Sequence, residues 1–161
     1  MSTDNIRDAV IAYAENCQNI RQCGGISPKW EGGSLRGLDL SGQNLSRTDF
    51  SGADFSGTKL VGVNFTDSVL CGATFKDSDC TDLDLYQVAA VGVDFSGCTM
   101  FNADFRFADM SESNFSGADL TNVDFRAAEI KGANFSGATL DADALERAES
   151  FMQSLVDALM S

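Results

Sequence analysis

Three aspartates are spaced so that they could share one site, which makes them the first candidates for chemistry. Asp84, Asp104 and Asp124 are spaced 20 residues apart. Arg106 comes two residues after Asp104, and Arg126 comes two residues after Asp124. Neighbouring carboxylates repel one another, so a hard cation could bind between them. The two arginines can neutralise the same carboxylates. We therefore predict no specific metal site and no cofactor.

The remaining reactive side chains do not predict an enzyme. Histidine, the commonest general base, is absent. Many serines stand in Ser-Gly pairs, which suit chain turns, and no histidine is available to activate them. The glycines match neither GxGxxG nor GxxxxGK[ST], the two phosphate-binding patterns. The sequence therefore predicts a non-enzymatic protein.

Length and charge limit the kinds of partner. The 161 residues suffice for one domain with a core, and 24 acidic against 11 basic residues give a net charge of −13. Such a surface repels nucleic acid and anionic lipid, so we expect a basic protein surface as partner, with no direct nucleic acid or membrane contact. The sequence predicts neither a membrane span nor a signal peptide. Five cysteines without CxxC spacing indicate free thiols and a cytoplasmic location.

A large apolar residue returns at every fifth position from Leu35 to Leu140. Of the 22 positions in this register, which we call centres, 17 are Leu or Phe. Neither a helix nor a strand repeats with a period of five. The residue two before each centre is mostly small or apolar, and the residue directly before it is acidic at 11 positions and Asn at four. This alternation over three residues predicts a very short strand.

The other two residues of each unit predict a turn. Two residues after the centre, Gly occupies 11 of 22 positions and Asp or Asn five more. These residues tolerate the positive φ that a type II turn requires. If four units close a square, every twentieth residue falls on the same face, and this step from Leu35 gives an almost pure Phe column. Because rings pack well on rings, we expect Phe75, Phe95 and Phe115 to lie one above another.

The units ADFSG, ANFSG and ADLTN resemble the A(D/N)LXX consensus of the pentapeptide-repeat family, and this match extends over residues 33–142. The resemblance implies an all-β solenoid, a right-handed quadrilateral β-helix, here of about five and a half coils. It also implies that each centre and the residue two before it point inward. We number the four faces by their first centre: face 1 from Leu35, face 2 from Leu40, face 3 from Leu45 and face 4 from Phe50.

An α-helix is predicted to cap each end of the solenoid, because open ends must be covered. Residues 1–32 form an N-terminal helix and capping loop, with partner binding by this helix as the alternative, and residues 33–142 form the β-helix. Residues 143–161 form a C-terminal helix that begins at a D-x-x-E capping box. By resemblance to family members with a known target, we expect a homodimer through Leu145, Phe151, Met152, Leu155 and Leu159.

Net negative charge is concentrated on faces 2 and 4, which lie opposite one another with net charges of −4 and −3, against −1 on each other face. Pentapeptide-repeat proteins of the quinolone-resistance type resemble duplex DNA and occupy the DNA groove of bacterial type II topoisomerases. This resemblance implies a DNA mimic that binds gyrase or topoisomerase IV. Six carboxylates would then stand in for phosphates: Asp39, Asp79, Asp119, Asp49, Asp109 and Glu129. The alternative is that they only keep the rod soluble.

Outward aromatic residues suggest a second hypothesis. Tyr86, Phe101 and Phe107 fall at outward positions on two neighbouring faces. Clustered exposed aromatics are typical of protein-binding sites. The alternative function is therefore a scaffold or signalling adaptor that docks through this aromatic patch or through a terminal helix.

Overall fold

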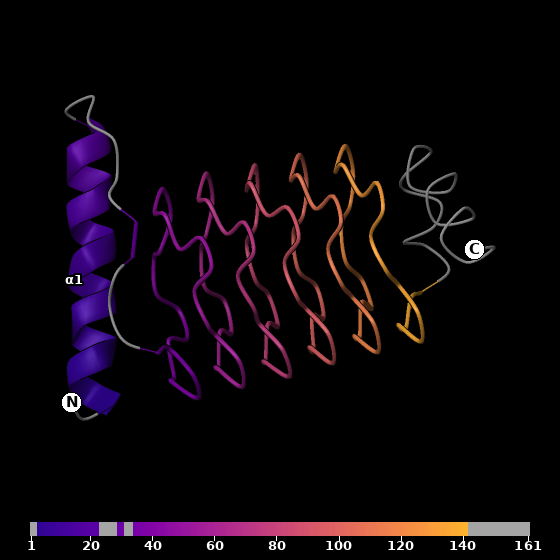
Figure 1. Ribbon diagram of the computed structural model, residues 1–161, viewed down its shortest axis with the longest axis horizontal. Helices are drawn as coiled ribbons and strands as arrows, with labels where there is room; N and C mark the ends of the chain where they lie inside the picture. The colour runs from indigo at the N-terminus through magenta and orange to yellow at the C-terminus, as the bar shows by residue number, and fades with distance from the viewer. Residues whose placement is uncertain (1–2, 23–28, 31–33, 142–161) are drawn as a thin grey trace.

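The computed structural model describes residues 3–22, 29–30 and 34–141. Helix α1, Thr3–Gln22, lies across one end of a row of stacked coils (Figure 1). Each five-residue unit of the described coils consists of a two-residue turn and a single bridge residue, rather than a longer strand. Among the described helical residues, none form a segment long and apolar enough to cross a bilayer.

The bridges confirm that four units complete one coil. All are parallel, and each joins a residue to the one four units later, as in Asp84 to Asp104 and Asp104 to Asp124. Backbone hydrogen bonds follow the same register: the amide of Phe75 donates to the carbonyl of Asp94 at 2.7 Å. The segment 34–141 therefore makes between five and six coils.

The corners are the type II turns predicted from glycine. Every fifth residue from 37 to 137 has positive φ, and 11 of these residues are Gly. At most corners the amide three residues after a centre donates to the carbonyl of that centre, as Ala53 does to Phe50 at 2.9 Å, whereas the amides of Thr48 and Val93 donate to the hydroxyls of Ser68 and Ser113. The five Asp or Asn residues at this position also take positive φ, as predicted, and so do Arg47, Gln87, Phe107, Glu112 and Ala127.

The core is a stack of centres inside the four faces. Every centre from Leu35 to Phe135 is at most 4% exposed. On face 1 the rings of Phe75, Phe95 and Phe115 stack with centroid separations of 4.9 and 5.2 Å, which confirms the predicted column. Buried hydroxyls two residues before a centre bond to backbone carbonyls, as Ser78 Oγ does to the Phe55 carbonyl at 2.7 Å. Such bonds satisfy polar groups that would otherwise be costly to bury.

Helix α1 packs directly on the first coils. Val10 and Ala14 are buried and belong to the same apolar cluster as the centres. The Tyr13 hydroxyl donates to the backbone carbonyl of Asp49 at 2.7 Å. The rings of Tyr13, Trp30 and Phe50 lie together, with centroids 5.1 to 6.0 Å apart. The second expected helix, residues 143–161, and its dimer residues lie outside the described part of the chain.

Candidate protein-binding faces

The residue before each centre caps the turn that follows it. Wherever this residue is Asp or Asn, its side-chain oxygen accepts a hydrogen bond from the amide two residues later; Asp119 accepts one from Thr121 at 3.1 Å, and Asn114 one from Ser116 at 3.1 Å. Asp and Asn do this equally well, because only the oxygen is used. The repeated carboxylates therefore have a structural function, which the sequence analysis assigned to charge alone.

Face 2 carries three of the six predicted phosphate-like carboxylates. Asp39 lies 3.8 Å from Lys59, and hydrogen bonds from Ser41 lower its pKa below the ordinary value of 3.8. Asp79 and Asp119 each accept bonds from the amide and hydroxyl of the threonine two residues later. Within the described residues, neither takes part in an ion pair, so both keep their charge available on the surface.

Face 4 carries the other three. Asp49 accepts bonds from the amide and hydroxyl of Ser51. Asp109 is exposed, and its carboxylate accepts a bond from the amide of Ser111. Glu129 is exposed as well and makes no turn-capping bond like that of the aspartates within the described residues. The six carboxylates thus lie on two opposing faces, as predicted, but at unequal exposure.

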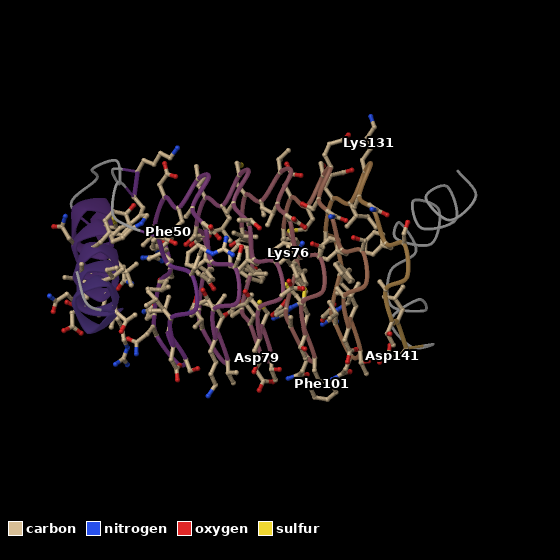
Figure 2. All side chains as sticks on the ribbon, turned by 60° about the horizontal axis from the view of Figure 1, so that its bottom comes forward. Phe50, Lys76, Asp79, Phe101, Lys131 and Asp141 are labelled. Atoms are coloured by element: carbon tan, nitrogen blue, oxygen red, sulfur yellow. The ribbon has the colours of Figure 1, made fainter. Side chains whose placement is uncertain are left out.

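The three predicted aromatic residues do not form one patch. Tyr86 and Phe107 pair at the corner between faces 3 and 4, with ring centroids 5.6 Å apart in a T-shaped arrangement. Phe101 instead lies on face 2, at the corner toward face 3, and is 46% exposed. No ring contact within the described residues joins it to the other two. Figure 2 shows Phe101 projecting from the same edge of the rod as Asp79 and Asp141.

Two of the three aspartates in the column of face 3, Asp104 and Asp124, bind arginine. The Arg106 guanidinium binds both oxygens of Asp104, with the shortest contact at 2.6 Å, and lies 3.8 Å from Asp124. Arg126 binds Asp124 in the same way. Arg106 also stacks over the Tyr86 ring at 5.5 Å, a cation–π contact. These arginines compete directly with a cation for the carboxylates.

An uncharged stretch in the middle of face 4 was missed by the sequence analysis. The units at 68–72 and 88–92, SVLCG and VAAVG, lie side by side and contain no charged residue. Their outward positions hold Val69, Cys71, Ala89 and Val91, of which Val91 is 38% exposed. The signal was visible in the sequence, because both units place apolar residues directly before and directly after the centre, where most other units have polar residues.

The geometry defines a class: a four-sided β-solenoid in which four five-residue units form each coil. Two family models match the chain, "Pentapeptide repeat region" over residues 63–135 and "Pentapeptide repeats (8 copies)" over residues 31–62. Together they extend over residues 31–135. The chain belongs to the pentapeptide-repeat family, whose fold is the right-handed quadrilateral β-helix.

Solved structures agree on the fold. The pentapeptide repeat protein Rfr23 from the cyanobacterium Cyanothece 51142 matches with a TM-score of 0.66 at 20% identity, over 67% of this chain and 88% of that one. A pentapeptide repeat protein from the Arabidopsis thaliana thylakoid lumen gives 0.52 at 28% identity, over 71% and 78%. The plasmid-mediated fluoroquinolone resistance protein QnrB1 gives a TM-score of only 0.30 at 29% identity, over 70% of this chain and 67% of that one. A comparison with curated proteins finds no match.

Proposed function

We propose that this protein is a non-enzymatic binding rod whose face 2 engages a basic protein surface. The observation that supports this most directly is the setting of Phe101. Its side chain is 46% exposed at the corner that follows Thr99, whose bridge partners are Asp79 of the preceding coil and Asp119 of the following one, and its backbone carbonyl accepts a hydrogen bond from the amide of Asp82. A phenylalanine exposed among carboxylates is poorly placed for stability and well placed for contact.

The physical roles of these groups differ. An exposed aromatic side chain that becomes buried on binding supplies much of the binding free energy. The surrounding carboxylates speed the approach of a basic partner and disfavour acidic ones. Because Asn would cap the turns equally well, Asp79 and Asp119 add a charge that folding does not require. Together these features favour a partner with a small apolar recess ringed by Lys or Arg.

A photo-crosslinking experiment tests this proposal. The full chain carries benzoylphenylalanine in place of Phe101, and the crosslinked proteins of the source cells are identified by mass spectrometry. We expect a partner that crosslinks beside its basic residues and whose capture falls at least tenfold in the Asp79→Asn, Asp119→Asn double variant. The same label at Ser116 on face 1 is the matched control. Equal capture from the two positions would contradict a specific role of face 2.

The second candidate is the duplex-DNA mimic that binds gyrase or topoisomerase IV. What favours it is the concentration of net negative charge on two opposing faces of a narrow rod. Phe101 argues against it, because no phosphate corresponds to an exposed ring. The test is gyrase supercoiling with added protein: loss of supercoiling that depends on Asp109 and Glu129 as well as on face 2 would favour the mimic. Unchanged supercoiling at micromolar protein would exclude it.

Two structural assignments belong to the same proposal. Helix α1 caps the first coil, as its contacts through Val10, Tyr13 and Ala14 suggest. Dimerisation through residues 143–161 stays a prediction, and analytical ultracentrifugation of the full chain against a chain ending at residue 142 would test it.

A further inference from the structure

We propose that the middle of face 4, with the adjoining corner, is a second binding surface for a short protein segment with an aliphatic centre and Lys or Arg at both ends. The surface consists of Val69, Cys71, Ala89, Val91, Tyr86 and Phe107, and we call it the apolar surface. It goes beyond the function proposed above, because it lies on a different face and recognises a different chemistry.

The apolar surface is continuous across two coils. Val69 and Ala89 are bridge partners, and the Leu70 amide donates to the Ala89 carbonyl at 2.7 Å. Cys71 lies in contact with the neighbouring coil, with its Sγ 3.6 Å from the Ala89 carbonyl oxygen. The glycines that follow, Gly72 and Gly92, add no side chains at the far corner. The result is a low apolar floor of two strand spacings, about 10 Å along the rod.

Tyr86 and Phe107 form a raised border on one side of this floor. Their rings meet at the corner from which the chain enters face 4, and the Arg106 guanidinium over Tyr86 holds that ring in place. Phe107 is 56% exposed and has a φ of 60°. The left-handed conformation is unfavourable for a bulky residue, and glycine fills the equivalent position at 11 corners. A strained and exposed phenylalanine is expected where function opposes stability.

Charges at the two ends of the apolar surface define its occupant. Asp49 precedes Val69 in the bridge ladder, with Lys29 as its other bridge partner, and Asp109 follows Ala89, with exposed Glu112, Glu129 and Lys131 beyond it. Asp49 and Asp109 are three coils apart, about 14 Å, which matches a helix of about ten residues or a strand of about five. A segment of that length with basic ends would place its charges at these carboxylates.

The same charges disfavour other occupants. Anionic lipid and nucleic acid would meet carboxylates at both ends. A second copy bound about a two-fold axis through the surface would place Asp49 of one copy against Asp109 of the other. Arg106 does not alter this balance, because Asp104 and Asp124 already bind its guanidinium. Since faces 2 and 4 lie on opposite sides, a rod could hold both partners at once.

A peptide selection tests the proposal. A phage library of random dodecapeptides is panned on the immobilised full chain, and an enriched peptide is then synthesised with a fluorescent label. We expect enriched sequences with two or more aliphatic residues between Lys or Arg. Val91→Ser and Phe107→Gly should each raise the Kd of that peptide about tenfold, because each removes apolar contact area. Ser116→Ala, which changes a residue of face 1 outside both proposed surfaces, is the control and should leave the Kd unchanged.

Cys71 provides a direct measure of occupancy. Its side chain is partly exposed within the apolar surface. Saturating peptide should slow its alkylation by iodoacetamide at least fivefold, as followed by peptide mass spectrometry. This protection should be lost in Val91→Ser, and it does not depend on whether face 2 binds any partner, so the two proposals can fail separately.

Five outcomes would overturn the proposal. The first three are no enrichment over an uncoated surface, enrichment of acidic peptides, and a Kd that neither Val91→Ser nor Phe107→Gly changes. The fourth is a concentration-dependent dimer that Val91→Ser abolishes, which would assign the surface to a second copy. The fifth is co-sedimentation of the wild-type chain, but not of Val91→Ser, with vesicles of phosphatidylcholine and phosphatidylserine.

Discussion

Phe95 and Phe115 lie one above the other on face 1, with ring centroids 5.2 Å apart and planes 9° apart. They are four units apart in the sequence, so the contact exists only because four units complete one coil. The column continues to Phe135 at 5.0 Å and 5°. Each ring is therefore packed on two neighbours of its own kind, and its removal affects two coil interfaces at once.

We predict that Phe95→Ala strongly destabilises the protein. The substitution leaves a cavity between the Phe75 and Phe115 rings, and a buried Phe→Ala change costs about 3–5 kcal/mol in the free energy of unfolding. Phe95→Leu should cost less, because more of the volume is kept. Guanidinium chloride unfolding followed by circular dichroism measures both. Phe101→Ala on the surface is the control and should change stability by no more than about 0.5 kcal/mol. Similar losses for Phe95→Ala and Phe101→Ala would contradict the stacked core.

We predict that Asp119→Asn preserves stability whereas Asp119→Ala does not. The carboxylate accepts bonds from the amide and hydroxyl of Thr121 at 3.1 and 2.6 Å, and an amide oxygen can accept both. Losing them should cost about 1 kcal/mol. Thermal unfolding compares the three proteins, and binding of the face 2 partner compares wild type with Asp119→Asn. A stability loss in the Asn variant as large as in the Ala variant would show that the stability depends on the charge of Asp119 and not on its turn-capping bonds.

The repeat could be read from the sequence because its period is strict. Centres such as Phe75 and glycines such as Gly92 recur without insertion, so a single register assigned every inward side chain and most corners. The turn-capping bonds were missed because an outward Asp can either cap a turn or simply carry surface charge. The sequence pattern is the same in both cases, and only the atomic contacts show that the carboxylate binds a backbone amide. The family resemblance predicted the fold correctly. The hypothesis of a DNA mimic came from the quinolone-resistance members of the family, and structural similarity does not support it.

The grouping of Tyr86, Phe101 and Phe107 failed for a different reason. All three side chains point outward. The two positions that follow a centre lie at a corner, however, and a shift of one residue there changes the direction in which a side chain points. Phe101 lies at the corner between faces 2 and 3, whereas Tyr86 and Phe107 lie at the corner between faces 3 and 4, so a whole face separates Phe101 from the other two. The apolar surface was missed because residues were counted by charge on each whole face, which hides an uncharged centre between acidic ends.

We predict that Phe107→Gly is more stable than Phe107→Ala by about 1 kcal/mol. Both variants lose the ring contact with Tyr86, so their difference reports only the left-handed backbone at φ 60°. Thermal and chemical unfolding measure it. The same pair of substitutions at Phe101, which does not have positive φ, should give the opposite order, because glycine there only adds unfolded-state freedom. If the Gly variant were the more stable one at both positions, or the Ala variant at both, the result would contradict backbone strain at Phe107.

We predict that Cys71 reacts with thiol reagents long before Cys80 and Cys98 in the folded protein. Cys71 is partly exposed, whereas the other two are buried. A hydrogen bond with Cys98 and burial both raise the pKa of Cys80 well above its ordinary value, which removes its reactive thiolate. Alkylation at mildly alkaline pH followed by peptide mass spectrometry measures the three rates. They should become similar in concentrated guanidinium chloride, and slow labelling of Cys71 under both conditions would contradict its exposure.

The Arg126–Asp124 pair should make stability depend on acid pH. Burial alone raises the pKa of Asp124, but hydrogen bonds and attraction from Arg126, and attraction from Arg106, outweigh it, so the pKa lies below its ordinary value of 3.8. A group with a depressed folded-state pKa contributes stability above its unfolded pKa, and this contribution is lost as the pH falls through the folded pKa. The Tm of the wild-type protein should therefore drop more steeply below pH 3.8 than the Tm of Arg126→Met or Asp124→Asn. Lys131→Met, which removes an exposed cation without a described ion pair, should keep the wild-type slope. Parallel Tm curves for all four proteins from neutral to strongly acid pH would exclude this pair as a source of acid sensitivity.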